Sequence, residues 1–236
     1  MNSNIFDEVT LKMVMILTME DVTPGSLHAQ YDAADCMSTL LRIISNLSFL
    51  WHLQRTIWKC ESCNRSISDS DHVAMARVAV SNHQCNNIID AAGAIKNYFE
   101  SAERGVEKNC DDCHGQRSTK STMLPTPSKF IVVQLLRFMA TEGVGEKIST
   151  EAIPFSSVDI ETCQGMCTYE VVGTVQHIGD RLEAGHFKAF IKQDNNWLEC
   201  NDERITSLGI NANDPTKNAY LVILRTTELD TSSPYS

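Results

Sequence analysis

The chain has 236 residues, of which 42% are hydrophobic and 21% are charged, and its formal net charge is -10. This composition is ordinary for a globular protein with a buried core, whereas the acidic balance argues against nucleic acid or an anionic membrane as a partner. The longest apolar runs, such as residues 130–136, are too short to span a bilayer, and the polar residues 1–7 are unlike a signal peptide. Nine cysteines without a secretory signal indicate a reducing compartment, cytoplasmic or nuclear, and a metal or catalytic use of the thiols.

Helical spacing of apolar residues dominates the first part of the chain. Residues 9–17 place apolar side chains on one helix face, and Pro24-Gly25-Ser26 breaks that segment. A long helix is predicted over 30–57, interrupted at most near 45–48, with Asp32 near its start, where a carboxylate suits the helix dipole.

The remaining pattern alternates helix-like and strand-like segments. After a strand over 73–80 and an amphipathic helix over 88–103, five further strands are predicted, over 129–139, 168–178, 186–192, 197–200 and 219–225. Loops rich in glycine and charge separate them, and residues 227–236 are polar and predicted to be disordered.

Two Cys-x-x-Cys pairs are the strongest chemical signal, and a folded insertion separates them. The spacing lets both sulfurs of a pair face one ion at about 2.3 Å, so two pairs complete a tetrahedral zinc site with no open position. Such a Zn2+ is structural rather than catalytic. The alternative is four unrelated buried thiols. If one of the four predicted ligands does not bind the zinc, His114 and Cys85 are the candidate substitutes. The predicted ligands are Cys60, Cys63, Cys110 and Cys113.

A second signal is an imidazole after a glycine at the start of a strand, followed by a strand that ends in an amide and a carboxylate. Neighbouring antiparallel strands can place Asn201 beside the His186 ring. A base oriented by a third group is two-thirds of a nucleophilic triad. The plainer alternative is a surface histidine on a hairpin.

Taken in order, several segments resemble the catalytic domain of the ubiquitin-specific proteases, a family of cysteine deubiquitinases. Residues 30–36 with Leu40-Leu41 are similar to the family's Gln-Asp-Ala box, and the two cysteine pairs to its zinc-binding fingers. Residues 124–138 are similar to the strand that enters its palm, residues 147–155 follow at the expected places, and residues 219–222 are similar to its closing strand. Its histidine box is matched by residues 169–179 and 185–187, with Trp197 and Asn201-Asp202.

The resemblance implies an α+β, papain-like cysteine-protease fold, with a palm and zinc fingers and with the helical thumb largely missing. It implies a remnant of the thumb over 1–28 and a catalytic domain over 29–226, with its finger region at about 58–116. Its partner would be ubiquitin or a ubiquitinated protein.

The resemblance also assigns site residues. His186 would be the general base, Asn201 would orient its ring, and Asp202 would be a supporting acid. Gln30 and Asp32 would line the channel for the ubiquitin tail, although Asp32 is as readily explained as a helix-capping acid. The loop over 179–185 is similar to a loop that covers the bound tail in the family.

The chain departs from the family pattern at the nucleophile, because residues 1–29 contain no cysteine. Cys36 should pack as a small hydrophobe, and Cys200 should point away from the face that carries Asn201. We therefore expect a deubiquitinase domain that is inactive alone, as a fragment of an active thiol hydrolase. The alternatives are a pseudo-deubiquitinase that binds ubiquitin as a scaffold, or a zinc-stabilised interaction domain.

Overall fold

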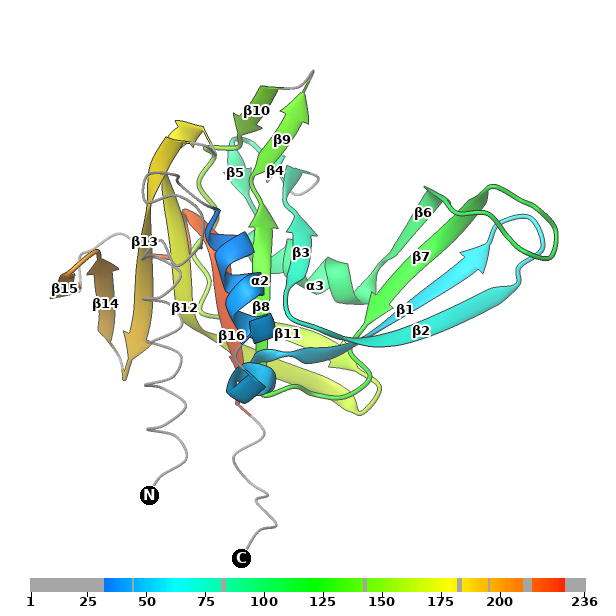
Figure 1. Cartoon of the computed structure of the whole chain (residues 1–236), viewed down its shortest axis with the longest axis horizontal. Helices are drawn as coiled ribbons and strands as arrows, with labels where there is room; N and C mark the ends of the chain where they lie inside the picture. The colour runs from blue at the N-terminus through cyan, green and yellow to red at the C-terminus, as the bar shows by residue number, and fades with distance from the viewer. Residues whose placement is uncertain are drawn as a thin grey trace, which may run out of the picture.

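The computed structural model describes residues 32–43, 45–81, 84–141, 144–181, 184–194, 196–209 and 214–227. Over these residues the fold is α+β, with strands in the majority (Figure 1). The helical elements are α2 (Ala33–Ile43), the 3-10 helix η1 (Ser45–Leu50) and α3 (Ala91–Glu100). The strands are β1 (His52–Cys60), β2 (Ser66–Val73), β3 (Ala76–Ala79), β4 (Gln84–Cys85), β5 (Ile88–Ile89), β6 (Ala102–Glu107), β7 (Arg117–Met123), β8 (Phe130–Leu136), β9 (Phe138–Thr141), β10 (Val144–Lys147), β11 (Ser157–Thr162), β12 (Gly165–Arg181), β13 (Ala184–Gln193), β14 (Asn196–Asn201), β15 (Arg204–Ser207) and β16 (Ala219–Thr226).

An eight-stranded sheet forms the body of the molecule. Its strand order is β15-β14-β13-β12-β16-β8-β3, and β11 pairs with β12 beside this path. The pairs are antiparallel except for β3 and β8, which run parallel. Sheets of this kind bury alternate side chains on opposite faces, and the apolar residues of the central strand β16 follow that rule on both faces.

Each face of the sheet carries a helix and a hydrophobic core. Leu221 and Ile223 of β16 belong to the core that includes α2, whereas Val222 and Leu224 belong to the core that includes α3. In Figure 1, α2 lies across β8 and β16. A strand buried on both faces reads as a continuous apolar run, which explains the sequence of 219–224.

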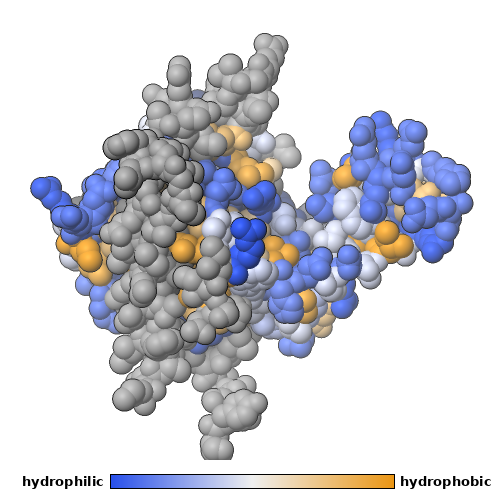
Figure 2. Space-filling view, viewed as in Figure 1, coloured by the Kyte–Doolittle hydropathy of each residue, from blue (hydrophilic) through white to orange (hydrophobic). Residues whose placement is uncertain are grey.

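The second sheet is a four-stranded antiparallel arm with the order β2-β1-β7-β6, which projects from one side of the body (Figure 1). Both of its faces meet solvent, and every residue from Ser66 to His72 is exposed. Figure 2 shows mostly hydrophilic residues on the visible side of the arm. With so little apolar burial, this sheet needs some other source of stability.

The predicted elements were partly right. The predicted helix over 30–57 is wrong beyond residue 50, because residues 52–60 form β1, which pairs with β2 and β7 in the arm. The predicted helix over 88–103 is shorter, since α3 ends at Glu100 and β6 follows. The later strands lie where they were predicted, except that β8 stops before Arg137 and β9 continues in another sheet.

Some predictions fall outside the described residues: the helical segment at 9–17, the thumb remnant over 1–28, Gln30, and all of the tail except residue 227. Among the described helices, none has the length and apolar character needed to cross a membrane.

Candidate active site and metal centre

The ring of His186 and the amide of Asn201 meet across adjacent strands. His186 lies on β13, Asn201 is the last residue of β14, and the distance from the imidazole Nε2 to the amide Oδ1 is 2.6 Å. Because an amide oxygen only accepts, Nε2 carries the hydrogen and Nδ1 keeps its lone pair. The hydrogen bond thus fixes one tautomer and leaves Nδ1 as the proton acceptor.

Asp202 follows Asn201 in the turn that leads to β15. Its Oδ2 lies 3.9 Å from His186 Nε2, and its side chain is 70% exposed. The backbone of Asp202 is left-handed, with φ +50°, a conformation that aspartate tolerates in turns. An exposed carboxylate at this distance can support a charged imidazolium, but solvent weakens the interaction.

Asp32 caps α2 and also bonds to the sheet. Its Oδ1 accepts hydrogen bonds from the backbone N–H groups of Ala34 (2.7 Å) and Asp35 (3.2 Å), and its Oδ2 accepts one from the Tyr220 hydroxyl (2.6 Å). The Tyr220 oxygen in turn accepts a bond from Gln134 Nε2 at 2.6 Å. The capping geometry predicted from the sequence is therefore present, whereas the role of Asp32 in tail binding stays a prediction.

A second imidazole, His177, is buried beside this chain of hydrogen bonds. Its ring packs edge-on against Phe138 and Phe187, with centroids 5.4 and 4.8 Å away. Neither ring nitrogen has a hydrogen-bond partner within the described part of the chain. Burial, and then the charge of Lys147, lower the pKa of His177, so the neutral ring is favoured. A Cβ at Gly185 would lie 2.2 Å from His177 Nε2, so only glycine fits there.

The predicted loop over 179–185 is largely a hairpin end, because β12 extends to Arg181 and β13 begins at Ala184. Lys147 fixes the end of β12, where this segment starts. Its Nζ donates to the carbonyl oxygens of His177 (2.8 Å) and Gly179 (2.6 Å). Gly179 has φ +129°, a conformation that favours glycine. These residues border a cavity of about 250 Å³ that also contacts Arg137.

Arg137 is a buried cation held by main-chain oxygens. It is 3% exposed, and its guanidinium donates to the carbonyls of Ala219, Ile148, Thr150 and Lys217 at 2.7–3.3 Å. Burial lowers its pKa to about 10. The side chain therefore ties the end of β8 to the start of β16 beneath the loop.

Three of the four described cysteines outside the arm are buried. Cys36 is 7% exposed within α2, and Cys200 is 3% exposed in the core that includes α2. Cys167 is also buried, and Cys163 is exposed in the turn between β11 and β12. The expectation that Cys36 and Cys200 pack as small core residues agrees with this burial.

The four cysteines predicted as metal ligands meet at the end of the arm. All four sulfurs lie within 4.8 Å of one another. Cys60 Sγ is 3.6 Å from Cys113 Sγ, and Cys63 Sγ is 3.7 Å from Cys110 Sγ. A zinc ion about 2.3 Å from each sulfur requires edges of about 3.8 Å, so these distances fit a tetrahedral site with four thiolate ligands. His114 is not part of the group that the structure brings together, and the side chain of Cys85 lies outside the described part of the chain.

Matching turns hold the two pairs. In each, a backbone N–H donates to the carbonyl four residues earlier, Asn64 to Cys60 and His114 to Cys110, both at 2.9 Å. Asn64 and His114 are both left-handed, with φ +61° and +55°. The backbone N–H groups of Cys63 and Ser62 lower the pKa of Cys60 to about 6, which favours the thiolate that a metal requires.

An ion pair also joins the two turns. Arg65, just after the first pair, forms an ion pair with Asp112 inside the second pair.

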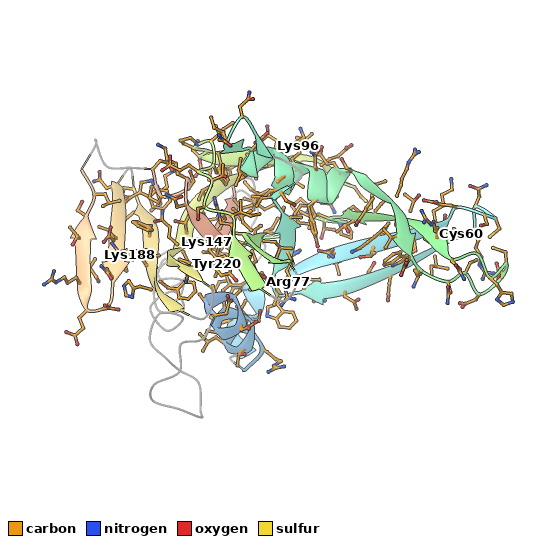
Figure 3. All side chains as sticks on the ribbon, turned by 90° about the horizontal axis from the view of Figure 1, so that it is seen from above. Cys60, Arg77, Lys96, Lys147, Lys188 and Tyr220 are labelled. Carbon is orange, nitrogen blue, oxygen red and sulfur yellow. The ribbon has the colours of Figure 1, made fainter. Side chains whose placement is uncertain are left out.

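Figure 3 labels Cys60 far out on the arm, and Lys188 and Tyr220 on the main body, so the cysteine cluster is remote from His186. A closed four-sulfur site at that place can brace the arm but cannot act on a substrate bound near His186.

Sequence reasoning gave no role to Lys147, Gln134, Tyr220 or Arg137. A usable signal existed for Tyr220, because a hydroxyl inside the apolar run of β16 must find a buried partner. An arginine that directly follows the apolar run of β8 similarly indicates a network of hydrogen bonds, since buried arginines need several acceptors.

Comparison with known proteins agrees with the fold and the family resemblance. The family model described as ubiquitin carboxyl-terminal hydrolase matches residues 13–224. A curated relative, ubiquitin carboxyl-terminal hydrolase A of Dictyostelium discoideum, is 30% identical over 59 residues, which are 25% of this chain and 7% of the relative.

Similar solved structures come from the SAGA deubiquitinating module. The module Ubp8/Sgf11/Sus1/Sgf73 bound to monoubiquitin matches with a TM-score of 0.64 and 17% identity over 84% of this chain and 49% of that chain. The same module bound to ubiquitin aldehyde has a TM-score of 0.63 and 17% identity, and the match covers 84% of this chain and 50% of that chain. The yeast module with a mutant Sgf73 has a TM-score of 0.63 and 16% identity, and the match covers 84% of this chain and 46% of that chain. The chain thus spans about half the length of the solved chains that it matches.

The fold is therefore that of a papain-like cysteine protease, as the sequence predicted. With a family match over most of its length, the chain belongs to the ubiquitin carboxyl-terminal hydrolase family, as a domain of the ubiquitin-specific protease type.

Proposed function

We propose that this chain supplies the palm, the fingers and the base of a ubiquitin-specific thiol hydrolase, which cleaves the isopeptide bond after the C-terminal glycine of ubiquitin. The hydrogen bond between His186 Nε2 and Asn201 Oδ1 carries the proposal. Relatives named ubiquitin carboxyl-terminal hydrolase, and similar structures bound to monoubiquitin or ubiquitin aldehyde, support it.

In this proposal His186 Nδ1 takes the proton from a cysteine thiol, and the thiolate attacks the carbonyl carbon of the terminal glycine. The imidazolium then gives its proton to the departing lysine amine, and water hydrolyses the acyl-enzyme through the same base. Asn201 keeps the ring in the tautomer that this transfer needs, and Asp202 supports the positive charge as it develops.

A thiol beside His186 is the part that the described residues do not supply. The described cysteine side chains lie in a core, in the arm cluster, or in the turn after β11. We therefore propose that the chain alone binds ubiquitin without turning it over. The competing function is a pseudo-deubiquitinase scaffold, which binds in the same way and never receives a nucleophile.

The channel for the ubiquitin tail would run past Asp32 and Gln30. Asp32 Oδ2 accepts the Tyr220 hydroxyl, and a carboxylate at this place suits the arginines of a basic tail. The 179–185 loop, anchored by Lys147 at one end and by the close contact of Gly185 at the other, would cover the bound tail.

The metal in this proposal is Zn2+, held by Cys60, Cys63, Cys110 and Cys113. Four thiolate ligands leave no position for a substrate, so the ion stabilises the arm. Thiols available for a metal also require a reducing compartment, such as the cytoplasm or nucleus.

Titration of isotope-labelled ubiquitin with the chain tests the binding. We expect amide shifts concentrated in the C-terminal residues of ubiquitin, and weaker binding by Asp32→Asn. That variant keeps the oxygen that caps α2 but loses both the charge and the acceptor for the Tyr220 hydroxyl. Tyr220→Phe, which removes the same hydrogen bond and keeps the carboxylate, is therefore the matched control, and it should bind ubiquitin more tightly than Asp32→Asn does. An absence of shifts with the folded chain contradicts the proposed function.

A fluorogenic ubiquitin substrate tests the chemistry. The purified chain should release no more fluorophore than His186→Ala, and faster release by the wild type refutes the prediction of no turnover. Labelling of the endogenous gene product by a ubiquitin vinyl-electrophile probe distinguishes an enzyme from the scaffold, since only an enzyme with a nucleophile is labelled.

A further inference from the structure

A cavity opens on the arm where β6 departs from regular pairing. The register of β6 against β7 shifts between Glu103 and Val106, and this bulge contains Gly105, with φ +71°. The cavity has a volume of about 560 Å³, within the range of about 300–1,000 Å³ that is typical of ligand pockets. We call it the bulge pocket, lined mainly by Lys59, Glu61, Arg104, Gly105, Arg117 and Thr119.

Three cations border the bulge pocket, although the chain as a whole has a net charge of -10. Lys59, Arg104 and Arg117 form no ion pair within the described part of the chain. Arg117 does not pair even with Glu107, its cross-strand partner, which lies outside the lining. A local concentration of unpaired positive charge on an acidic protein attracts anions specifically to that place.

The one carboxylate in the wall is committed to the backbone. Glu61 Oε1 accepts hydrogen bonds from the Gly105 N–H at 2.8 Å and from the Thr119 hydroxyl at 3.3 Å. These bonds hold the bulge that shapes the pocket. Glu61 therefore lowers the positive charge without closing the pocket or pairing with either arginine.

Gly105 also provides the surface over which Arg117 lies. The position that a Cβ would take at Gly105 is 3.6 Å from Arg117 Nη1. The guanidinium thus rests over the bulge, where its planar fork can receive a carboxylate through two hydrogen bonds.

The opposite face of the same sheet differs. There Lys108 and Lys120 lie 4.8 and 5.5 Å from the centre of the Trp58 ring. These cations already have an aromatic partner. Unpaired positive charge around a cavity is therefore a property of the bulge pocket and not of the arm in general.

We propose that the bulge pocket is an anion-binding site that docks an acidic peptide segment of a partner protein. Its cations come from three adjacent strands, Lys59 from β1, Arg117 from β7 and Arg104 from β6. Neighbouring strands are about 4.8 Å apart, so these residues span about 10 Å across the sheet. That span suits several carboxylates along an extended peptide, whose residues rise about 3.3 Å each, better than one small anion.

Fluorescence anisotropy of a labelled hexaglutamate peptide tests the site at low salt. The acidic chain repels a polyanion overall, so binding reports a local cationic surface. Arg104→Ala combined with Arg117→Ala should raise the dissociation constant by about tenfold or more. The matched control is Lys108→Ala combined with Lys120→Ala, which removes the same charge from the opposite face and should change it by less than about twofold.

Each other outcome counts against the proposal. No binding by the wild-type chain overturns it, and so does an equal loss in both double variants when their melting temperatures match that of the wild type. Inorganic phosphate that displaces the peptide at the peptide's own concentration overturns the assignment to a peptide. The result is independent of ubiquitin binding, because the proposed tail channel lies on the body and the pocket on the arm.

Discussion

His52 should make the stability of the folded chain depend on pH between about 4 and 6.5. It begins β1 at the base of the arm, is fully buried, and has no hydrogen-bond partner for either ring nitrogen within the described residues. Burial lowers its pKa from 6.5 to about 4, with Gln54 opposing the shift and His72 adding to it.

The unfolded chain therefore binds the proton more readily than the folded chain. Stability is fully present above the unfolded pKa of 6.5 and is lost as the pH falls toward about 4. With a pKa of 6.5 in the unfolded state and about 4 in the folded state, the free energy of unfolding should be about 2 kcal/mol lower at pH 5 than at pH 7.

Urea unfolding of the wild type and of His52→Phe, each at pH 7 and pH 5, measures this effect. The variant keeps an aromatic ring against Phe99, whose ring centroid is 6.0 Å away, and removes the titrating group. The loss between the two pH values should be smaller in the variant by about 2 kcal/mol. Acid release of metal and titration of His177 affect both proteins, so they cancel in the difference.

The comparison variant is His72→Gln, which removes an exposed histidine from β2 that makes the smallest contribution to the lowered pKa of His52. It should reduce the pH dependence by much less than His52→Phe does. If His52→Phe loses as much stability between pH 7 and pH 5 as the wild type does, the reasoning about a buried neutral ring is refuted.

Three further substitutions test other parts of the structure. Cys110→Ser should abolish bound zinc in metal analysis and lower the melting temperature, whereas Cys163→Ser, at an exposed thiol outside the cluster, should change neither. Tyr220→Phe removes the hydroxyl that donates to Asp32, and should lower the free energy of unfolding by about 1–3 kcal/mol in urea titrations; a loss below experimental error would contradict that hydrogen bond. Gly185→Ala should weaken ubiquitin binding and destabilise the fold, because its Cβ would overlap the neighbouring histidine ring, and a fully stable variant would show that the ring moves freely.

The sequence predicts the chemistry of this protein better than it predicts the arm. The two cysteine pairs were identified from their spacing alone, and the structure brings their sulfurs together. The approach of His186 and Asn201 followed from two strands separated by a short turn. Local spacing is enough in both cases, because the groups that meet lie on matched turns or on neighbouring strands.

A finger region was predicted at about 58–116, but the strands of the arm were not, because they carry no strand-like pattern. β2 reads Ser-Ile-Ser-Asp-Ser-Asp-His-Val and is exposed along nearly its whole length, so there is no alternation between apolar and polar residues to detect. Leu53 and Ile57 of β1 continue the helical spacing of α2, and only pairing with β2 and β7 makes that segment a strand.

The site details that were missed depend on distant contacts. Asp32 and Tyr220 are 188 residues apart, and Arg137 reaches carbonyls 80 or more residues away. No pattern within a short window reports such partners, although a polar group inside an apolar strand does report that a partner must exist.

The small buried area of the arm has consequences for how this protein unfolds. The body keeps two cores on either side of its sheet, whereas the strands of the arm bury little besides His52, Cys60, Ser118 and Thr122. We therefore expect the arm and the body to unfold as separate cooperative units, and we expect a chelator that removes the proposed zinc to unfold the arm while the body stays folded. Scarcity of zinc in the cell would then abolish binding through the arm without unfolding the rest of the protein.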